Sequence, residues 1–208
     1  MKQKINIEEW SRKDHFNFFS QFEEPFFGLT INIDCTKAYA HCKANGHSFF
    51  LYYLYQCLKA VNETEAFRYR IINKEVFLYD VVNASPTINR PDETFGFAYM
   101  PYQPTFEQFV ETANVEMERV RNSKGLEPAL SGENVVHFSS IPWIKFTSIT
   151  HARAFSYPDS IPKISFGKAS DEGGKMLMPV SVNGHHGLMD GWHVAQFVER
   201  FQKNMDTI

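Results

Sequence analysis

The sequence predicts an α/β fold, a two-layer sandwich in which helices cover a large mixed β-sheet. Three observations predict it. Stretches that alternate apolar and polar residues, as strands do, interleave along the chain with stretches of helical periodicity. One predicted helix is apolar on almost every side, so it must be deeply covered. The composition, 43 % hydrophobic and 15 % aromatic over 208 residues, can fill a thick core.

The first half of the chain supplies two helices, a strand and a hairpin. In order, the patterns predict a helix over residues 7–19, a strand over 29–34, a helix over 48–61 and a hairpin whose turn is Asn73-Lys74. The first helix has Trp10, Phe16 and Phe19 at mixed helical spacing, and the strand LTINID alternates in polarity.

The second half continues the alternation. It predicts a strand over 93–100 with Phe95, Phe97 and Tyr99 on one face, a helix opened by a capping box at 105–108, a strand over 135–140, a hairpin around Gly173-Gly174 and a last helix over 192–205. The loosest stretch, residues 122–134, is interpreted as a surface loop. No linker divides the chain, so we expect one domain over residues 1–208.

Composition excludes several classes of function. A formal charge of −3 lacks the basic excess that nucleic-acid binding needs. The longest strongly apolar run, FFLYYLY from Phe49, is far below the roughly 20 residues that span a bilayer, and the start has no signal-peptide pattern. Three cysteines without CxxC spacing fit a reducing compartment. We therefore expect a cytoplasmic protein without membrane or nucleic-acid partners.

Residues with side chains suited to catalysis are most concentrated in the stretch NGHHGLMDGWH, between a predicted strand and a predicted helix. A histidine there suits general-base work, because its ordinary pKa lies near neutrality. The sequence allows four alternative roles for Asp190: it could orient a histidine, bind a cation, form an ion pair or cap the last helix. His185, His186, Asp190 and His193 could also ligate zinc, although no H-x-x-x-H helix is present and adjacent histidines on a strand face apart. We expect no metal.

Read as a whole, HHGLMDG resembles the HHxxxDG motif of CoA-dependent acyltransferases. Three further stretches narrow the resemblance to the chloramphenicol acetyltransferase family. They are WSRKDHF at 10–16, SSIPWIKFTS at 139–148 and DGWHVAQFVERFQ at 190–202. The resemblance runs nearly end to end and implies that family's CoA-dependent acyltransferase-like fold.

The resemblance implies roles for four residues. His186, the second histidine of the motif, would be the base that takes the proton from an acceptor hydroxyl. Ser139, four residues before the tryptophan of the P-W pair, would stabilise the oxyanion. Asp190 would form a buried structural ion pair with Arg12. The acceptor oxygen would attack the thioester of acetyl-CoA directly, so no acyl-enzyme is implied.

The resemblance also implies the binding residues and the assembly. Acetyl-CoA would be a co-substrate, contacted by Ser165 and Lys168, and no cofactor would be bound permanently. We expect Trp143 to pack in the core near the channel for CoA. The candidate walls of the acceptor pocket are Phe18, Phe27, Phe95, Phe97, His151, Arg153 and Lys163. Without the resemblance, Phe95 and Phe97 are expected by default to be core residues. The chain would form a homotrimer with each active site at a subunit interface.

Some positions depart from the family pattern. His151, Arg153 and Lys163 stand where apolar pocket residues are expected, and unpaired polar groups are costly to bury. Ser48 and Phe50 replace a lysine and a tyrosine near the CoA phosphate, which predicts weaker CoA binding. The function expected is an acetyl-CoA-dependent O-acetyltransferase. The alternatives are the same chemistry on a more polar or anionic acceptor, a non-catalytic ligand-binding relative, and a metal-binding protein.

Overall fold

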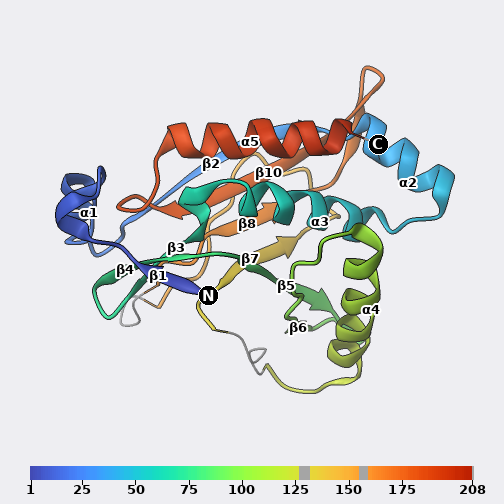
Figure 1. Cartoon of the computed structure of the whole chain (residues 1–208). Helices are drawn as coiled ribbons and strands as arrows, with labels where there is room; N and C mark the ends of the chain where they lie inside the picture. Colours follow the sequence, from blue (N-terminus) through green and yellow to red (C-terminus); the bar gives the residue numbers. More distant parts are fainter. Residues whose placement is uncertain (127–131, 155–158, 208) are drawn as a thin grey trace.

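The large β-sheet organises the molecule. A computed structural model describes residues 1–126, 132–154 and 159–207 (Figure 1). Within them the sheet has the strand order β2-β10-β8-β7-β5-β6, with β9 paired to β10. Its strands are β2 (Phe26–Asp34), β5 (Asn83–Asn89), β6 (Phe95–Phe97), β7 (Val135–Ser140), β8 (Lys163–Phe166), β9 (Ser170–Glu172) and β10 (Lys175–His185). β5, β7 and β8 run parallel and the other pairs are antiparallel, so the predicted mixed sheet is confirmed.

A smaller sheet in the order β1-β4-β3 lies beside the large one. Its strands are β1 (Lys2–Lys4), β3 (Tyr69–Ile72) and β4 (Glu75–Tyr79). Asn73 and Lys74 join β3 to β4 with φ of 52° and 66°, the left-handed conformation that a two-residue hairpin turn requires. Gly173 and Gly174 do the same between β9 and β10. Both predicted hairpin turns are therefore confirmed.

Some of the helices begin where a side chain accepts a hydrogen bond from one of the first amide groups. The helices are α1 (Lys13–Phe19), α2 (Thr36–Asn45), α3 (Phe49–Asn62), α4 (Phe106–Asn122) and α5 (Gly191–Asp206), with short 3-10 turns η1 (Ile7–Glu9) and η2 (Glu65–Arg68). The Ser48 and Thr105 hydroxyls accept from the amides of Leu51 and Gln108, at 3.4 and 3.3 Å. In the described part of the chain, no helix has the length and apolarity to cross a bilayer.

The apolar core lies between one face of the sheet and the helices. Successive strand residues point to opposite faces, and Phe138, Ile164 and Val180 point to the face that α3 and α5 cover. Figure 1 shows α3 and α5 along this face, and the two helices pack against each other. α4 instead packs beside β5 and β6. The large sheet and its helical cover form the two predicted layers.

The opposite face of the sheet carries polar side chains in rows. Ser139 on β7 pairs in register with Ser165 on β8, Ser165 with Ser181 on β10, and Ser181 with Thr30 on β2. The four hydroxyl-bearing residues thus form one row across four strands. The neighbouring row on this face contains His137 and Lys163. Chemistry-bearing side chains therefore gather on the face away from the helical core.

Several elements differ from the sequence prediction, and strands β1 and β5 were not predicted. The helix expected over residues 7–19 is divided, because Trp10 takes an extended conformation and packs its ring 5.1 Å from that of Tyr69. The strand expected over 93–100 is only β6, because Glu93 has a φ of 64° in a turn. Helix α2 was not predicted at all, since its apolar residues form almost no stripe.

Candidate active site

The stretch from His185 to Asp190, called here the histidine turn, connects β10 to α5. The Gly187 amide donates to Nδ1 of His185 at 3.1 Å, and the amides of Leu188 and Met189 donate to its carbonyl oxygen. Gly184 precedes the turn, and a Cβ there would lie 2.2 Å from the Met189 sulfur. The glycine therefore provides packing space under the turn.

His186 is held by its backbone and by aromatic rings. Its amide donates to the Pro25 carbonyl at 2.8 Å, and its own carbonyl accepts from Arg12 at 3.0 Å. Its imidazole stacks on Phe19, with centroids 3.9 Å apart and planes 3° apart, and the Phe27 ring lies 4.6 Å away. Nδ1 is buried and has no hydrogen-bond partner among the described residues. Nε2 is thus the nitrogen open to a ligand.

Asp190 has two of the roles that the sequence left open. One carboxylate oxygen lies 2.7 Å from Arg12, and the other accepts from the Trp192 amide at 3.0 Å, which caps α5. His193 Nδ1 lies 2.8 Å from the capping oxygen. Burial opposes ionisation of Asp190, but the hydrogen bonds from Arg12 and His193 outweigh it and hold the pKa of this carboxyl well below its usual range. The carboxylate therefore joins the histidine turn to the amino-terminal segment.

Ser139 and Ser140 point to opposite faces of β7. The Ser140 hydroxyl contacts the Tyr53 hydroxyl at 3.1 Å, on the side of α3. The Ser139 side chain is half-buried on the polar face and makes no hydrogen bond among the described residues. Its hydroxyl is therefore free to donate to a ligand.

One chain does not bring His186 and Ser139 together. Ser139 lies level with Ser181 of β10, and His186 follows Ser181 by five residues. Strand geometry then separates the backbones of Ser139 and His186 by roughly 15–20 Å. The two side chains cannot span such a distance.

The residues expected to contact CoA differ in exposure. Ser165 is fully buried, whereas Lys168 is exposed. The Lys168 amide donates to the Ile144 carbonyl at 2.9 Å, which joins the end of β8 to the turn that carries Trp143. The expectation that Trp143 packs in the core is wrong, because its side chain is 65 % exposed. The turn projects this ring away from the sheet.

The expected aromatic pocket walls fall into two groups. Phe27 contacts the His186 ring, and Phe18 lies 59 % exposed on α1, 5.1 Å from Phe19. Phe95 and Phe97 lie on β6, four strand positions from β10. Phe95 is 41 % exposed, so the default expectation of a core residue is wrong there: β6 is an edge strand. A single chain does not form one pocket from these four rings.

The two predicted cations of the pocket are paired. Lys163 donates to Asp159, and Arg153 donates to Glu24. Both cations also lie over the Phe26 ring, Arg153 at 3.6 Å and Lys163 at 4.7 Å from its centroid. The cost of burying unpaired charge is thereby avoided. The third polar replacement, His151, approaches Ser165.

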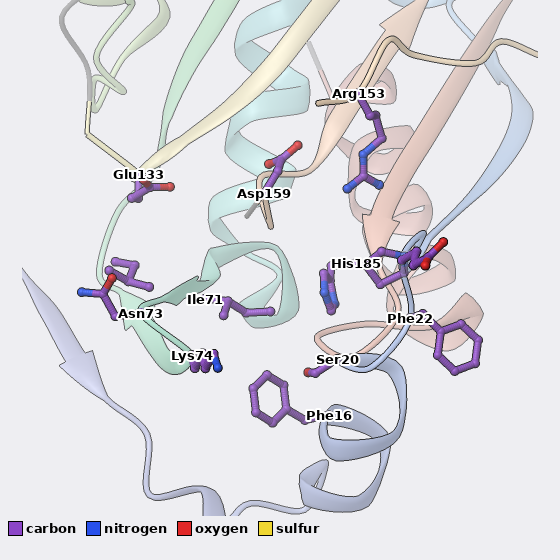
Figure 2. A pocket seen from close by; sticks show the side chains of 13 residues that line it. Phe16, Ser20, Phe22, Ile71, Asn73, Lys74, Glu133, Arg153, Asp159 and His185 are labelled. Carbon is purple, nitrogen blue, oxygen red and sulfur yellow. The ribbon is translucent and has the colours of Figure 1, made fainter. Parts of the chain in front are cut away.

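A cavity of about 760 Å³ opens beside His185. Figure 2 shows Phe16, Arg153, Asp159 and His185 around it, from elements far apart in the sequence. Burial and the nearby Arg153 charge lower the pKa of His185 to about 4, so this imidazole is neutral near pH 7. Of the predicted pocket residues, only Arg153 lines this cavity.

Several contacts were not predicted from the sequence. They are the Phe19 ring on His186, the Arg12 bond to the His186 carbonyl, and the carboxylates Glu24 and Asp159. Asp159 stands four residues before Lys163, a spacing that could have suggested the pair. The described residues contain no group of three or more His, Cys, Asp or Glu side chains that could hold a metal ion.

Solved structures with the same fold include a chloramphenicol acetyltransferase. It aligns with a TM-score of 0.91 and 32 % identity over 99 % of this chain and all of its own. Dihydrolipoamide acetyltransferase from Azotobacter vinelandii aligns with a TM-score of 0.69 at 14 % identity, over 93 % of this chain and 86 % of its own, which shows a shared fold. The fold and the histidine turn define a CoA-dependent acyltransferase.

Sequence comparison narrows this class. The family model described as chloramphenicol acetyltransferase matches residues 2–202. Chloramphenicol acetyltransferase 3 of Escherichia coli is 31 % identical over 96 % of this chain and 95 % of its own length, and the enzyme of Bacillus pumilus is 31 % identical over 92 % and 88 %. The chain therefore belongs to the chloramphenicol acetyltransferase family.

Proposed function

We propose that the protein transfers the acetyl group of acetyl-CoA to a hydroxyl of chloramphenicol, as one catalytic domain over residues 1–208. The observation that carries the proposal is the histidine turn, with His186 held by rings and its Nε2 left open. Relatives that are 31 % identical over more than nine-tenths of this chain are named chloramphenicol acetyltransferases. They support the same acceptor here.

In this mechanism Nε2 of His186 takes the proton from the acceptor hydroxyl as its oxygen attacks the thioester carbon. The carbonyl electron pair moves onto the oxygen and forms a tetrahedral oxyanion. The Ser139 hydroxyl, which has no other partner among the described residues, donates to that oxygen. When the carbonyl re-forms, the carbon–sulfur bond breaks, and the thiolate of CoA receives the proton from His186.

The binding residues follow from their positions. We assign Lys168 and Trp143 to the acetyl-CoA side, where an exposed lysine and an exposed indole can meet a large charged co-substrate, and Ser165 to a buried position near it. We assign Phe18 and Phe27 to the acceptor side next to His186. We assign Phe95, Phe97, His151 and Lys163 to the remaining wall. Arg153, which lines the cavity beside His185, is assigned to the acceptor side as well.

The separation of His186 from Ser139 supports a site built between subunits. Because one chain holds these groups roughly 15–20 Å apart, a second copy must supply one of them. We therefore propose a homotrimer in which His186 of one copy faces Ser139 of the next, a cyclic arrangement that closes on itself. The three buried free cysteines suit the reducing cytoplasm.

The ion pairs of Arg153 and Lys163 bear on the alternative that the acceptor is anionic. Arg153 and Lys163 each have a carboxylate partner, so neither offers a free charge to an anionic acceptor. They keep the wall polar, however, and a more polar neutral alcohol is the second candidate. A non-catalytic role would leave the open Nε2 of His186 without a use.

The first experiment measures thiol release from acetyl-CoA with chloramphenicol and with a panel of more polar and anionic alcohols. We expect release with chloramphenicol that saturates with both substrates. Release only with another alcohol would replace the acceptor, and no release above hydrolysis with any alcohol would overturn the enzymatic proposal.

The second experiment mixes two inactive variants, His186→Ala and Ser139→Ala, after denaturation and joint refolding. A site formed between neighbours recovers both intact groups in about a quarter of the interfaces of a random mixture. We expect about a quarter of the wild-type activity. Refolded mixtures that remain as inactive as each variant alone would show that the two groups act within one chain or not at all.

A further inference from the structure

The hydroxyl row on the polar face places Ser165 next to Ser139. The two serines pair in register on adjacent parallel strands and point to the same side. Side chains in this relationship have Cβ atoms roughly 5 Å apart, so two hydroxyls that do not bond to each other can still reach one shared ligand oxygen. Ser165 is fully buried, so its hydroxyl needs a partner inside the protein.

His151 is that partner. Its Nε2 lies 3.5 Å from the Ser165 Oγ, at the outer limit of a hydrogen bond, and no other hydrogen bond to this hydroxyl is found in the described residues. His151 comes from the described residues that follow β7, and its contact with Ser165 places it on the polar face. It is therefore the side chain that fixes the orientation of Ser165.

His151 is suited to hold a neutral hydroxyl. Burial and the nearby Lys163 charge lower its pKa, so the imidazole is neutral near pH 7. A neutral ring has one donor and one acceptor nitrogen, and either can bind a hydroxyl that rotates to match. Neither serine carries charge, so the contact of His151 with Ser165 adds no cost for a buried ion.

We propose that His151 is a positioning residue for acetyl transfer. It fixes the Ser165 hydroxyl beside Ser139, so that both hydroxyls can meet the thioester carbonyl oxygen. The inference rests on the proposed function and extends it, because it assigns a role to a histidine where the family pattern has an apolar residue. No new bond or proton transfer is added to the reaction.

The test is a double-mutant cycle. His151→Leu and Ser165→Ala each lower kcat about tenfold, the effect of one misaligned hydrogen bond in the transition state, while KM changes less than about twofold. The double variant loses no more than the larger single effect, because both substitutions break one chain of contacts. His151→Gln recovers most of kcat, since the amide can still bind the hydroxyl.

The matched control is His137→Leu, a histidine in the neighbouring row of the same face, which should leave kcat and KM unchanged. Additive losses in the double variant, an unaltered kcat in His151→Leu, or an effect on KM alone would overturn the proposal. Imidazole ¹⁵N resonances test the His151–Ser165 contact independently of the proposed acetyl transfer. The His151 resonances shift in Ser165→Ala whether or not acetyl transfer occurs, and unshifted resonances would disprove the contact.

Discussion

The ring of Phe19 lies parallel to the imidazole of His186, with the two centroids 3.9 Å apart. No hydrogen bond from the described residues holds the imidazole at Nδ1. Stacking therefore fixes the plane of the ring, while the hydrogen bonds with Pro25 and Arg12 fix the position of the His186 backbone. An aromatic residue on a short helix thus directs Nε2, the atom on which the proposed chemistry depends.

Replacing Phe19 with leucine should lower kcat about tenfold and change KM by less than about twofold. Leucine fills space but cannot stack, so the imidazole samples other rotamers, and a misplaced base costs rate. Steady-state kinetics test this. Phe22→Leu, which alters the same aromatic cluster without touching His186, is the control. Equal effects in the two variants would contradict a specific role for stacking.

His186→Ala should lower kcat by a factor on the order of a thousand, the range expected for a lost general base. Binding of acetyl-CoA, measured by calorimetry, should change by less than about twofold. His15→Ala, at an exposed position on α1, should keep full activity. Near wild-type turnover in His186→Ala would remove this residue as the base.

Ser139→Ala and Ser140→Ala should have opposite signatures. The first removes a free hydroxyl on the polar face and should lower kcat about a hundredfold with little loss of stability. The second leaves the buried Tyr53 hydroxyl without its partner and should cost about 1–2 kcal/mol of unfolding free energy, with kcat nearly unchanged. Steady-state kinetics and thermal unfolding of both variants test this. A loss of kcat in Ser140→Ala and a loss of stability in Ser139→Ala would exchange the two roles.

Asp190→Asn should lower the unfolding free energy at pH 7 by about 2 kcal/mol, because Arg12 loses a charged partner at a partly exposed site. Asparagine still caps α5, so the change isolates the charge. The pKa of Asp190 is depressed in the fold, so its contribution is fully present above the ordinary value of 3.8 and declines as the pH falls below it.

Thermal unfolding across pH tests this linkage. The wild-type and Asp190→Asn melting temperatures should differ by roughly 4–8 °C at pH 7, and the difference should begin to shrink below pH 4 as the pH approaches the lowered pKa of the folded state. A constant difference down to pH 3 would mean that the aspartate acts through its shape alone.

Much of the fold could be predicted because local patterns and packing agree. Ser48 and Thr105 begin helices, and the turn at Asn73 needs the left-handed conformation that asparagine tolerates. α2 escaped prediction because its apolar residues lack a stripe, although Gly46 at its end has the φ of 69° typical of a helix terminus. The exposure of Trp143 could not be predicted, because large apolar side chains are usually buried and this one is exposed.

The candidate site could be predicted only in part. The two contacts of Asp190 follow from its place before α5 and from the family resemblance. The partners of Arg153 and Lys163 could not be predicted with them, because Glu24 meets Arg153 only after the chain has folded across 129 positions. The stack of Phe19 on His186 is likewise a property of tertiary packing.

The distance between His186 and Ser139 within one chain has a consequence for how the protein behaves on dilution. If each reaction centre requires two chains to meet, specific activity depends on protein concentration even when every molecule is folded. Serial dilution at constant substrate concentration should then abolish activity at protein concentrations where the circular dichroism spectrum is still unchanged. An added excess of His186→Ala chains should restore part of the activity.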